Sequence, residues 1–304
     1  MSHTRRMVEE LRRRLGEDAP MCQVQAPLEP IEPPPSRVIP RGAIRDERFA
    51  REAAQHTTAL VGVGRVGSRY ATEVVLQFQA ELAVAHAAVA AELSEDWAES
   101  AGLPLLRSRV GHHREFLLRP DLGRRLDAQA VAWLEANARR DVDVQPILAD
   151  GLSAVACMGS GPELMGHFIA QCEALGLRVG TPVLAKYARV WLQDEIGELC
   201  RAKVACILLG ERPGLGTGDG LSAYMVYEPR VGRNDGERNM ISNIHARGML
   251  PADAAQRLAR LAQGMIQQRT SGVELDLSAI PGLGGVGGTA LREPQVRKRL
   301  VEVP

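Results

Sequence analysis

The sequence contains few aromatic residues and no excess of charge of either sign. Phe, Trp and Tyr make up 4% of the 304 residues, which disfavours a surface that binds bases or sugars by stacking. The 37 Lys and Arg residues balance 37 Asp and Glu residues, so no global positive field attracts nucleic acid or an anionic membrane. The composition therefore predicts neither nucleic acid nor a membrane as the main partner.

Cysteine is also sparse, and its spacing fits neither a disulfide framework nor a zinc site. The five cysteines form no CxxC pair, and their number is odd. The seven histidines are scattered without a ligand pattern such as HExxH, so we predict no metal site. The chain begins without an apolar signal region and has no run of membrane length. We therefore expect a cytoplasmic protein.

Glycine and proline are abundant but unevenly distributed, and they divide the chain into segments. The pattern RRMVEELRRRL predicts an amphipathic helix within 1–19, which serves either as a targeting tag or as a solvated tail. Seven of the 18 prolines lie between residues 20 and 40, which predicts an extended linker over 20–42. The tract PGLGGVGG predicts a flexible glycine-rich tail over 276–304.

The remaining residues fall into two regions with different hydrophobic patterns. The segment 43–139 is predicted to be a helical domain, with a long alanine-rich helix over 71–93 and a second helix over 127–139. From 140 to 275, strand and helix patterns alternate. This alternation predicts an α/β domain with a parallel sheet and helices on both faces.

A glycine motif at 62–67, GVGRVG, matches the GxGxxG pattern of dinucleotide-binding proteins. That fold requires a second strand soon after the helix, and here one long helix follows instead. An NAD-dependent oxidoreductase is therefore an alternative rather than the leading hypothesis. The same motif is also explained by a glycine-rich turn, or by a contact with an anion or a partner through Arg65 and Arg69.

A second glycine-rich loop is the stronger candidate site. In ILLGERPGLGTGDGLSAY (207–224) it follows a buried strand and carries Glu211 and Arg212. Ligands bind open α/β sheets at the carboxyl ends of the strands, where the strand ends at 150–153 and 187–190 are also expected. No nucleophile–base–orienter triad is visible in the spacing. These residues predict a site for a large polar ligand, without naming it.

The chain resembles a known family, the small (light) subunit of ethanolamine ammonia-lyase, which is an adenosylcobalamin-dependent enzyme. The matching segments run in order over about residues 60–275: GRVGSR, LLRPDLGRRL, DGLS, GLRVGTP, KYARV, DEIGE, LLGERPGLG, LSAYMVYEPR, RNMISNIH and SGVEL. The resemblance implies a helical N-terminal domain and a Rossmann-like, mostly parallel sheet domain. It also implies that cobalamin lies between this subunit and a large barrel subunit that houses the substrate and the radical chemistry.

The resemblance further assigns three cofactor-binding residues by position. They are Val190 in YARV, Glu211 in GERPGL and Met240 in RNMISNIH. The family has a cysteine where Met240 stands and a glycine where Ala188 stands. No catalytic residue is implied on this subunit.

The leading hypothesis is therefore the small subunit of an ethanolamine ammonia-lyase, which converts ethanolamine to acetaldehyde and ammonia. It would clamp adenosylcobalamin against the large subunit. A non-catalytic cobalamin-binding module is the second hypothesis, because the motifs depart from the family at several positions, among them Met240 and Ala188. The N-terminal helix over 1–19 matches the family's address for a bacterial microcompartment, whose shell would then be a further partner.

Overall fold

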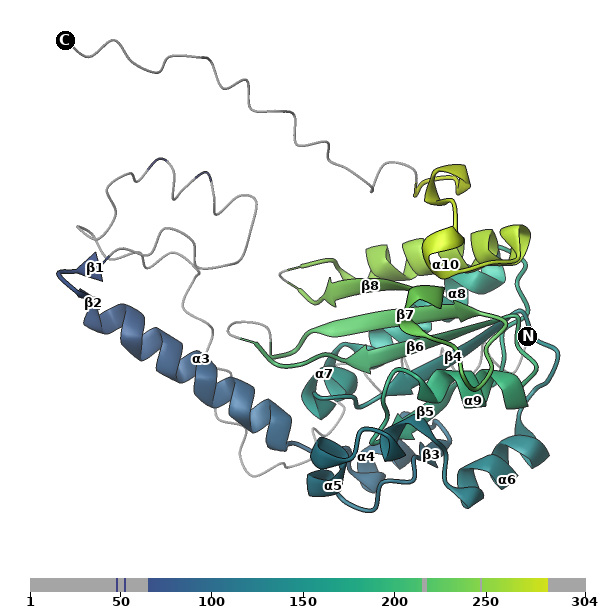
Figure 1. Cartoon of the computed structure of the whole chain (residues 1–304), viewed down its shortest axis with the longest axis horizontal. Helices are drawn as coiled ribbons and strands as arrows, with labels where there is room; N and C mark the ends of the chain where they lie inside the picture. The colour runs from purple at the N-terminus through teal and green to yellow at the C-terminus, as the bar shows by residue number, and fades with distance from the viewer. Residues whose placement is uncertain (1–47, 49–51, 53–64, 215–217, 247, 284–304) are drawn as a thin grey trace, which may run out of the picture.

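The structure, a computed structural model, describes residues 48, 52, 65–214, 218–246 and 248–283 (Figure 1). Its centre is a six-stranded sheet in the order β3-β5-β4-β6-β7-β8. In chain order the strands are β3 (Leu105–Arg107), β4 (Val144–Ala149), β5 (Val183–Lys186), β6 (Val204–Gly210), β7 (Leu221–Tyr227) and β8 (Arg238–Ile244). The predicted α/β class is confirmed at this level.

The sheet is mixed rather than mostly parallel. Strands β3, β5, β4 and β6 run parallel to one another, whereas β7 is antiparallel to both β6 and β8. The connection from β6 to β7 spans only 211–220, and a parallel crossover needs a dozen or more residues. A Rossmann-like arrangement is therefore not confirmed.

Helices cover both faces of the sheet and bury a core on each. On one face lie α7 (Ala154–Gly159), α8 (Gly161–Ala174) and α10 (Pro251–Gln268), and on the other α6 (Ala128–Asn137) and α9 (Leu192–Leu199) (Figure 1). The strands of the centre are apolar on both sides, and β4 and β6 are buried at every residue. Such continuous hydrophobic runs are typical of strands covered on two faces.

Local capping explains where several of these helices begin. The Asp127 side chain accepts a hydrogen bond from the Ala130 amide and starts α6, as the sequence predicts. The Ser153 hydroxyl does the same for α7 by accepting from the Ala156 amide. Pro251 occupies the first turn of α10, where its missing amide hydrogen costs nothing.

Before α6 the described chain forms a small hairpin, the edge strand β3 and three α-helices. Strands β1 (Arg65–Val66) and β2 (Arg69–Tyr70) pair with each other, and α3 (Thr72–Ala90), α4 (Glu95–Ala101) and α5 (His113–Leu118) follow. A separate helical domain over 43–139 is not confirmed, because β3 lies within that range and pairs with β5 at the edge of the main sheet.

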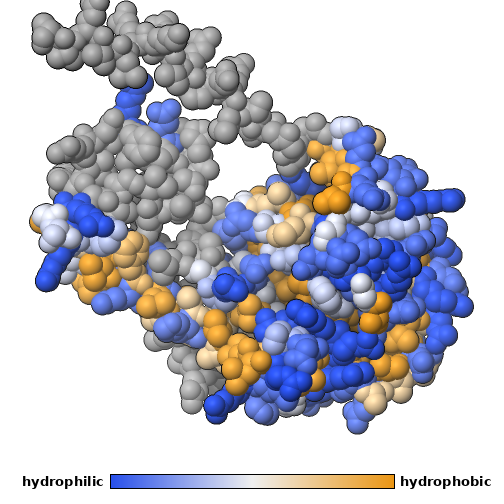
Figure 2. All heavy atoms as spheres, viewed as in Figure 1, coloured by the Kyte–Doolittle hydropathy of each residue, from blue (hydrophilic) through white to orange (hydrophobic). Residues whose placement is uncertain are grey.

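Helix α3 extends away from the sheet and carries apolar side chains into solvent (Figures 1 and 2). Leu76 is 59% exposed, and Leu82 and Val84 are also exposed. Within the described residues, no single helix has the length and hydrophobicity of a membrane span, although α3 and α4 together reach those values across an 83° bend.

The two predicted terminal segments fall largely on residues that the structure does not describe. The N-terminal helix (1–19) and the linker (20–42) lie outside the described residues, so the targeting role stays a prediction. Of the predicted tail, residues 276–283 are described, and Ile280 and Leu283 pack into the core beside α10. The folded part therefore extends at least to residue 283, and 284–304 lie outside the description.

Candidate functional site

The carboxyl ends of β4, β5 and β6 meet at one edge of the sheet, as the sequence predicts. Leu152, after β4, donates its amide hydrogen to Gly210 O at the end of β6 over 2.9 Å. The Ser153 hydroxyl donates to Gly218 O over 3.0 Å and so fastens the returning loop. The turn after β4 is thus joined by backbone and side-chain hydrogen bonds to the end of β6 and to the loop that follows it.

Asp150 links the end of β4 to the end of β5. Its Oδ2 accepts from the Tyr187 amide at 2.6 Å, and its Oδ1 accepts from the Ala188 amide at 3.0 Å. Tyr187 has a φ of 55°, a left-handed conformation that is uncommon for a residue with a side chain. The carboxylate holds this turn, and the turn leads directly to Val190.

Burial has a marked effect on the acidity of Asp150. Its side chain is enclosed, and loss of solvation raises its pKa to about 6, although the two amides and nearby Lys186 act in the opposite direction. Since burial penalises the charged form, the pKa of a carboxyl group rises above its ordinary value. This carboxylate is therefore maintained at neutral pH at a cost in stability.

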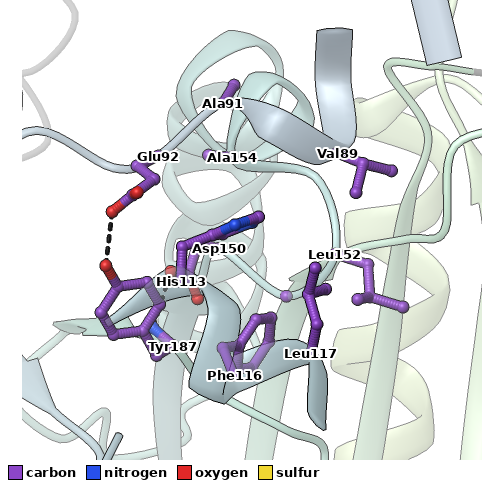
Figure 3. Close-up of a pocket in the computed structure, with 11 residues that line it drawn as sticks. Val89, Ala91, Glu92, His113, Phe116, Leu117, Asp150, Leu152, Ala154 and Tyr187 are labelled. Carbon is purple, nitrogen blue, oxygen red and sulfur yellow. Dashed lines mark hydrogen bonds between the residues drawn. The ribbon is translucent and has the colours of Figure 1, made fainter. Parts of the chain in front are cut away.

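A shallow pocket lies beside Asp150, between the end of α3 and helix α5 (Figure 3). The Tyr187 hydroxyl donates a hydrogen bond to Glu92 Oε2 across its mouth. Lys186 Nζ lies 4.0 Å from the same carboxylate oxygen. Phe116 and Leu117 give the pocket an apolar wall. These contacts attach α3 to the sheet edge.

Two of the three predicted cofactor residues, Glu211 and Met240, lie next to the same tyrosine. The Tyr224 hydroxyl donates to Glu211 Oε2 at 3.3 Å, and Tyr224 stands opposite Met240 in the β7–β8 ladder. Burial and the neighbouring Glu211 carboxylate raise the pKa of Tyr224 to about 12, so its hydroxyl remains a donor at physiological pH. Residues directly opposite in a ladder share a face of the sheet.

The third predicted residue, Val190, belongs to the same side of the sheet. It packs, partly buried, against the core cluster under α6 and α9, as Tyr224 does. Met240 is 51% exposed on the edge strand β8, although the neighbouring strand β7 is mostly buried. We use the term open face for a partly apolar area with one carboxylate, formed by Val190, Tyr224, Glu211 and Met240.

Sequence reasoning did not single out Tyr224. It stands in the segment LSAYMVYEP, where strand alternation places it on one face with Val226 and opposite Met225. The alternation identifies the face of the sheet on which Tyr224 lies but not the residue to which its hydroxyl donates a hydrogen bond. The hydrogen bond to Glu211 depends on the antiparallel return of β7, which was not predicted.

The GVGRVG motif does not have dinucleotide-binding geometry in the part that is described. Arg65–Val66 and Arg69–Tyr70 form a hairpin outside the six-stranded sheet, whereas the dinucleotide motif joins a strand of the main sheet to its helix. Gly67, with a φ of 65°, supplies the left-handed conformation of the turn. Gly62 and Gly64 lie outside the described residues.

His245, in the turn after β8, has a structural role. Its side chain is 2% exposed, and its Nε2 lies 2.6 Å from Asn243 Oδ1. Its backbone amide donates to Met249 O. These contacts close the turn from within, as expected for a turn histidine.

The raised pKa of Asp150 predicts an unusual dependence of stability on pH. The folded-state pKa of about 6 exceeds the ordinary 3.8, so the folded state binds the proton more tightly. The contribution of this group is then fully present below about pH 4 and is lost as the pH rises through about 6. In urea titrations of the full chain, the wild type should lose about 2 kcal/mol more than Asp150→Asn between about pH 4 and 7. If the free energies of unfolding of the two proteins change in parallel with pH, the Asp150 carboxyl group does not titrate as stated.

The fold and this site define a class: an α/β protein whose mixed sheet presents an open face that extends from the carboxyl ends of β5 and β6 across β7 and β8. The family model of the ethanolamine ammonia-lyase light chain (EutC) matches residues 47–276 of the 304. The chain belongs to this family. It is therefore a subunit of an ammonia-lyase, and the light-chain family implies a large-subunit partner.

Proposed function

We propose that this chain is the small subunit of an adenosylcobalamin-dependent ethanolamine ammonia-lyase and that its open face holds the cofactor against the large subunit. The proposal rests on the position of three residues on the same side of the sheet: Val190, Glu211 and Met240. Two of the three lie beside Tyr224. The family match supports the enzyme as a whole.

The chemistry of the open face fits a corrin ring with amide side chains. Met240 offers a soft, adaptable apolar surface that is half exposed. The Glu211 carboxylate accepts hydrogen bonds, and cobalamin amides are donors. Glu211 Oε1 already accepts from the Arg212 amide, and Oε2 from Tyr224, so the carboxylate is oriented before any ligand arrives.

The residues of this chain act by binding and orientation in this proposal. Met240 and Val190 would exclude water from the side of the cofactor that faces this subunit, and Glu211 would hold it by accepting a hydrogen bond from one of its amides. Asp150 holds the turn that carries Val190. When bound, adenosylcobalamin supplies the radical that starts the reaction, and the substrate is converted in the large subunit.

A non-catalytic cobalamin-binding module remains the second candidate, because Met240 stands where the family has a cysteine. The side chain of methionine is longer, so the cofactor has to accommodate it on the open face. The large exposed fraction of Met240 favours accommodation, because its unbranched side chain is free to change rotamer.

Co-expression with a cognate large subunit distinguishes these possibilities. The proposal predicts a stable complex that releases ammonia from ethanolamine only when adenosylcobalamin is present. A complex that binds the cofactor without ammonia release would favour the module. A chain that forms no complex and is stabilised against heat by NAD would contradict the proposal.

A further inference from the structure

A buried ion pair connects α9 to β8. Arg238 Nη1 and Nη2 each donate to one oxygen of Asp194, both over 2.7 Å. The two side chains are 3% and 2% exposed. The parallel two-bond geometry fixes orientation as well as distance, because the guanidinium fork matches the carboxylate plane.

This pair stands between two of the residues proposed to contact the cofactor. Asp194 lies in the first turn of α9, four residues after Val190. Arg238 opens β8, two residues before Met240, and alternation along a strand places both on the same face. The ion pair therefore ties the segment with Val190 to the strand with Met240.

A second set of contacts reinforces the same connection. The Trp191 indole, next to Val190 in the chain, donates from Nε1 to Asp235 Oδ1 at 2.6 Å. The guanidinium carbon of Arg238 lies 5.7 Å from the centre of the Trp191 ring. Asp235 belongs to the turn just before β8. Trp191 and Asp235, which lie near the two partners of the ion pair in the chain, are thus hydrogen-bonded to each other as well.

Stability alone is a poor explanation for this pair. Removing two charges from water costs about as much as their attraction returns, and apolar replacements of both partners are often neutral or stabilising. Burial raises the pKa of Asp194 although Arg238 opposes that shift, so the site disfavours a charge. What the pair does provide is a defined geometry between two segments.

We propose that Asp194 and Arg238 are positioning residues that set the spacing and orientation of Val190 and Met240, so that both contact one cofactor molecule. The inference rests on the proposed function of the open face. Neither side chain reaches the cofactor, since both are enclosed by protein. The pair acts through the segments that it joins.

The test replaces both partners at once in the complex with the large subunit. The double variant Arg238→Met with Asp194→Leu removes both charges and keeps an apolar filling, so the thermal midpoint should stay near that of the wild type. The KM for adenosylcobalamin should rise about tenfold or more, because a shift of about 1 Å between two contacts is costly. The kcat at saturating cofactor should stay within about twofold, since the chemistry is elsewhere.

The matched control is Asp143→Asn, just before β4, which is separated from β8 by the strands β6 and β7. Asp143 is also largely buried and is paired with Arg178 and Lys203, at 3.1 Å and 2.8 Å. Its loss should lower the thermal midpoint and leave the KM for adenosylcobalamin unchanged. Comparing this control with the double variant separates the effect of losing any buried ion pair from the effect of losing the Asp194–Arg238 pair.

A double variant with wild-type midpoint and wild-type KM would overturn the proposal and leave the pair a purely structural element. If the double variant does not assemble, Arg238→Lys decides, because lysine keeps the charge and loses the fork. A raised KM in that variant supports positioning, and an unchanged KM, or failure of both variants to assemble, contradicts it. If the wild-type complex itself neither binds adenosylcobalamin nor turns over, the proposed function fails instead.

Discussion

Replacing Gly210 by alanine is expected to destabilise the chain by about 3 kcal/mol and to disrupt the open face. Gly210 ends β6 at the point where the β4 turn crosses it. A Cβ there would overlap the backbone oxygens of Asp150 and Ser153. Backbone cannot rotate aside as a flexible side chain does, so the strand end and the turn must separate.

The measurement is the urea midpoint of the full chain, followed by the KM of the complex for adenosylcobalamin. Gly159→Ala is the control, because a Cβ at Gly159 meets nothing within 4 Å. That variant should match or slightly exceed the wild type in stability, since alanine favours the helix. Equal midpoints for the Gly210 variant and the wild type would show that the close approach is dispensable.

Met240→Asp is expected to raise the KM for adenosylcobalamin by about 100-fold while leaving the fold intact. An unpaired carboxylate covered by an apolar ligand surface costs several kcal/mol, and about 1.4 kcal/mol corresponds to a factor of ten. Met240 is 51% exposed in this chain, so the free protein gives the new charge access to water. Cofactor binding removes that access.

Val273→Asp is the matched control, since Val273 is 90% exposed and lies on a 3-10 turn (Gly272–Glu274). This turn is hydrogen-bonded to the side chain of Asn239, which strand alternation places on the opposite face of β8 from Met240. Both variants should unfold at nearly the wild-type temperature. Only Met240→Asp should raise the KM. Equal KM values for the two variants would mean that Met240 does not face the cofactor.

Local patterns in the sequence were sufficient to predict much of the fold. The helix predicted over 127–139 is α6 (Ala128–Asn137), and the Asp127 side chain caps its start. The strand ends at 150–153 and 187–190 were predicted to meet, and Asp150 joins them. These features depend on caps, periodicity and the general rule for strand ends.

Features that depend on long-range pairing could not be predicted in the same way. The antiparallel course of β7 was missed because strand alternation is the same in either direction, although the short connection over 211–220 already excludes a parallel crossover. The pairing of Asp194 with Arg238 joins residues 44 positions apart, and nothing in DEIGE or RNMISNIH indicates it. The edge strand Leu105–Arg107 is too short to stand out within a region of helical pattern.

The most direct test of the cofactor assignment is amide hydrogen exchange in the two-subunit complex, with and without adenosylcobalamin. The account predicts slower exchange on cofactor addition in 187–192, 210–214 and 238–244, the segments around the open face. Amides of α8 and α10, on the opposite side of the sheet, should be unchanged. Protection confined to the large subunit, with these three segments unaffected, would contradict the claim that this chain holds the cofactor.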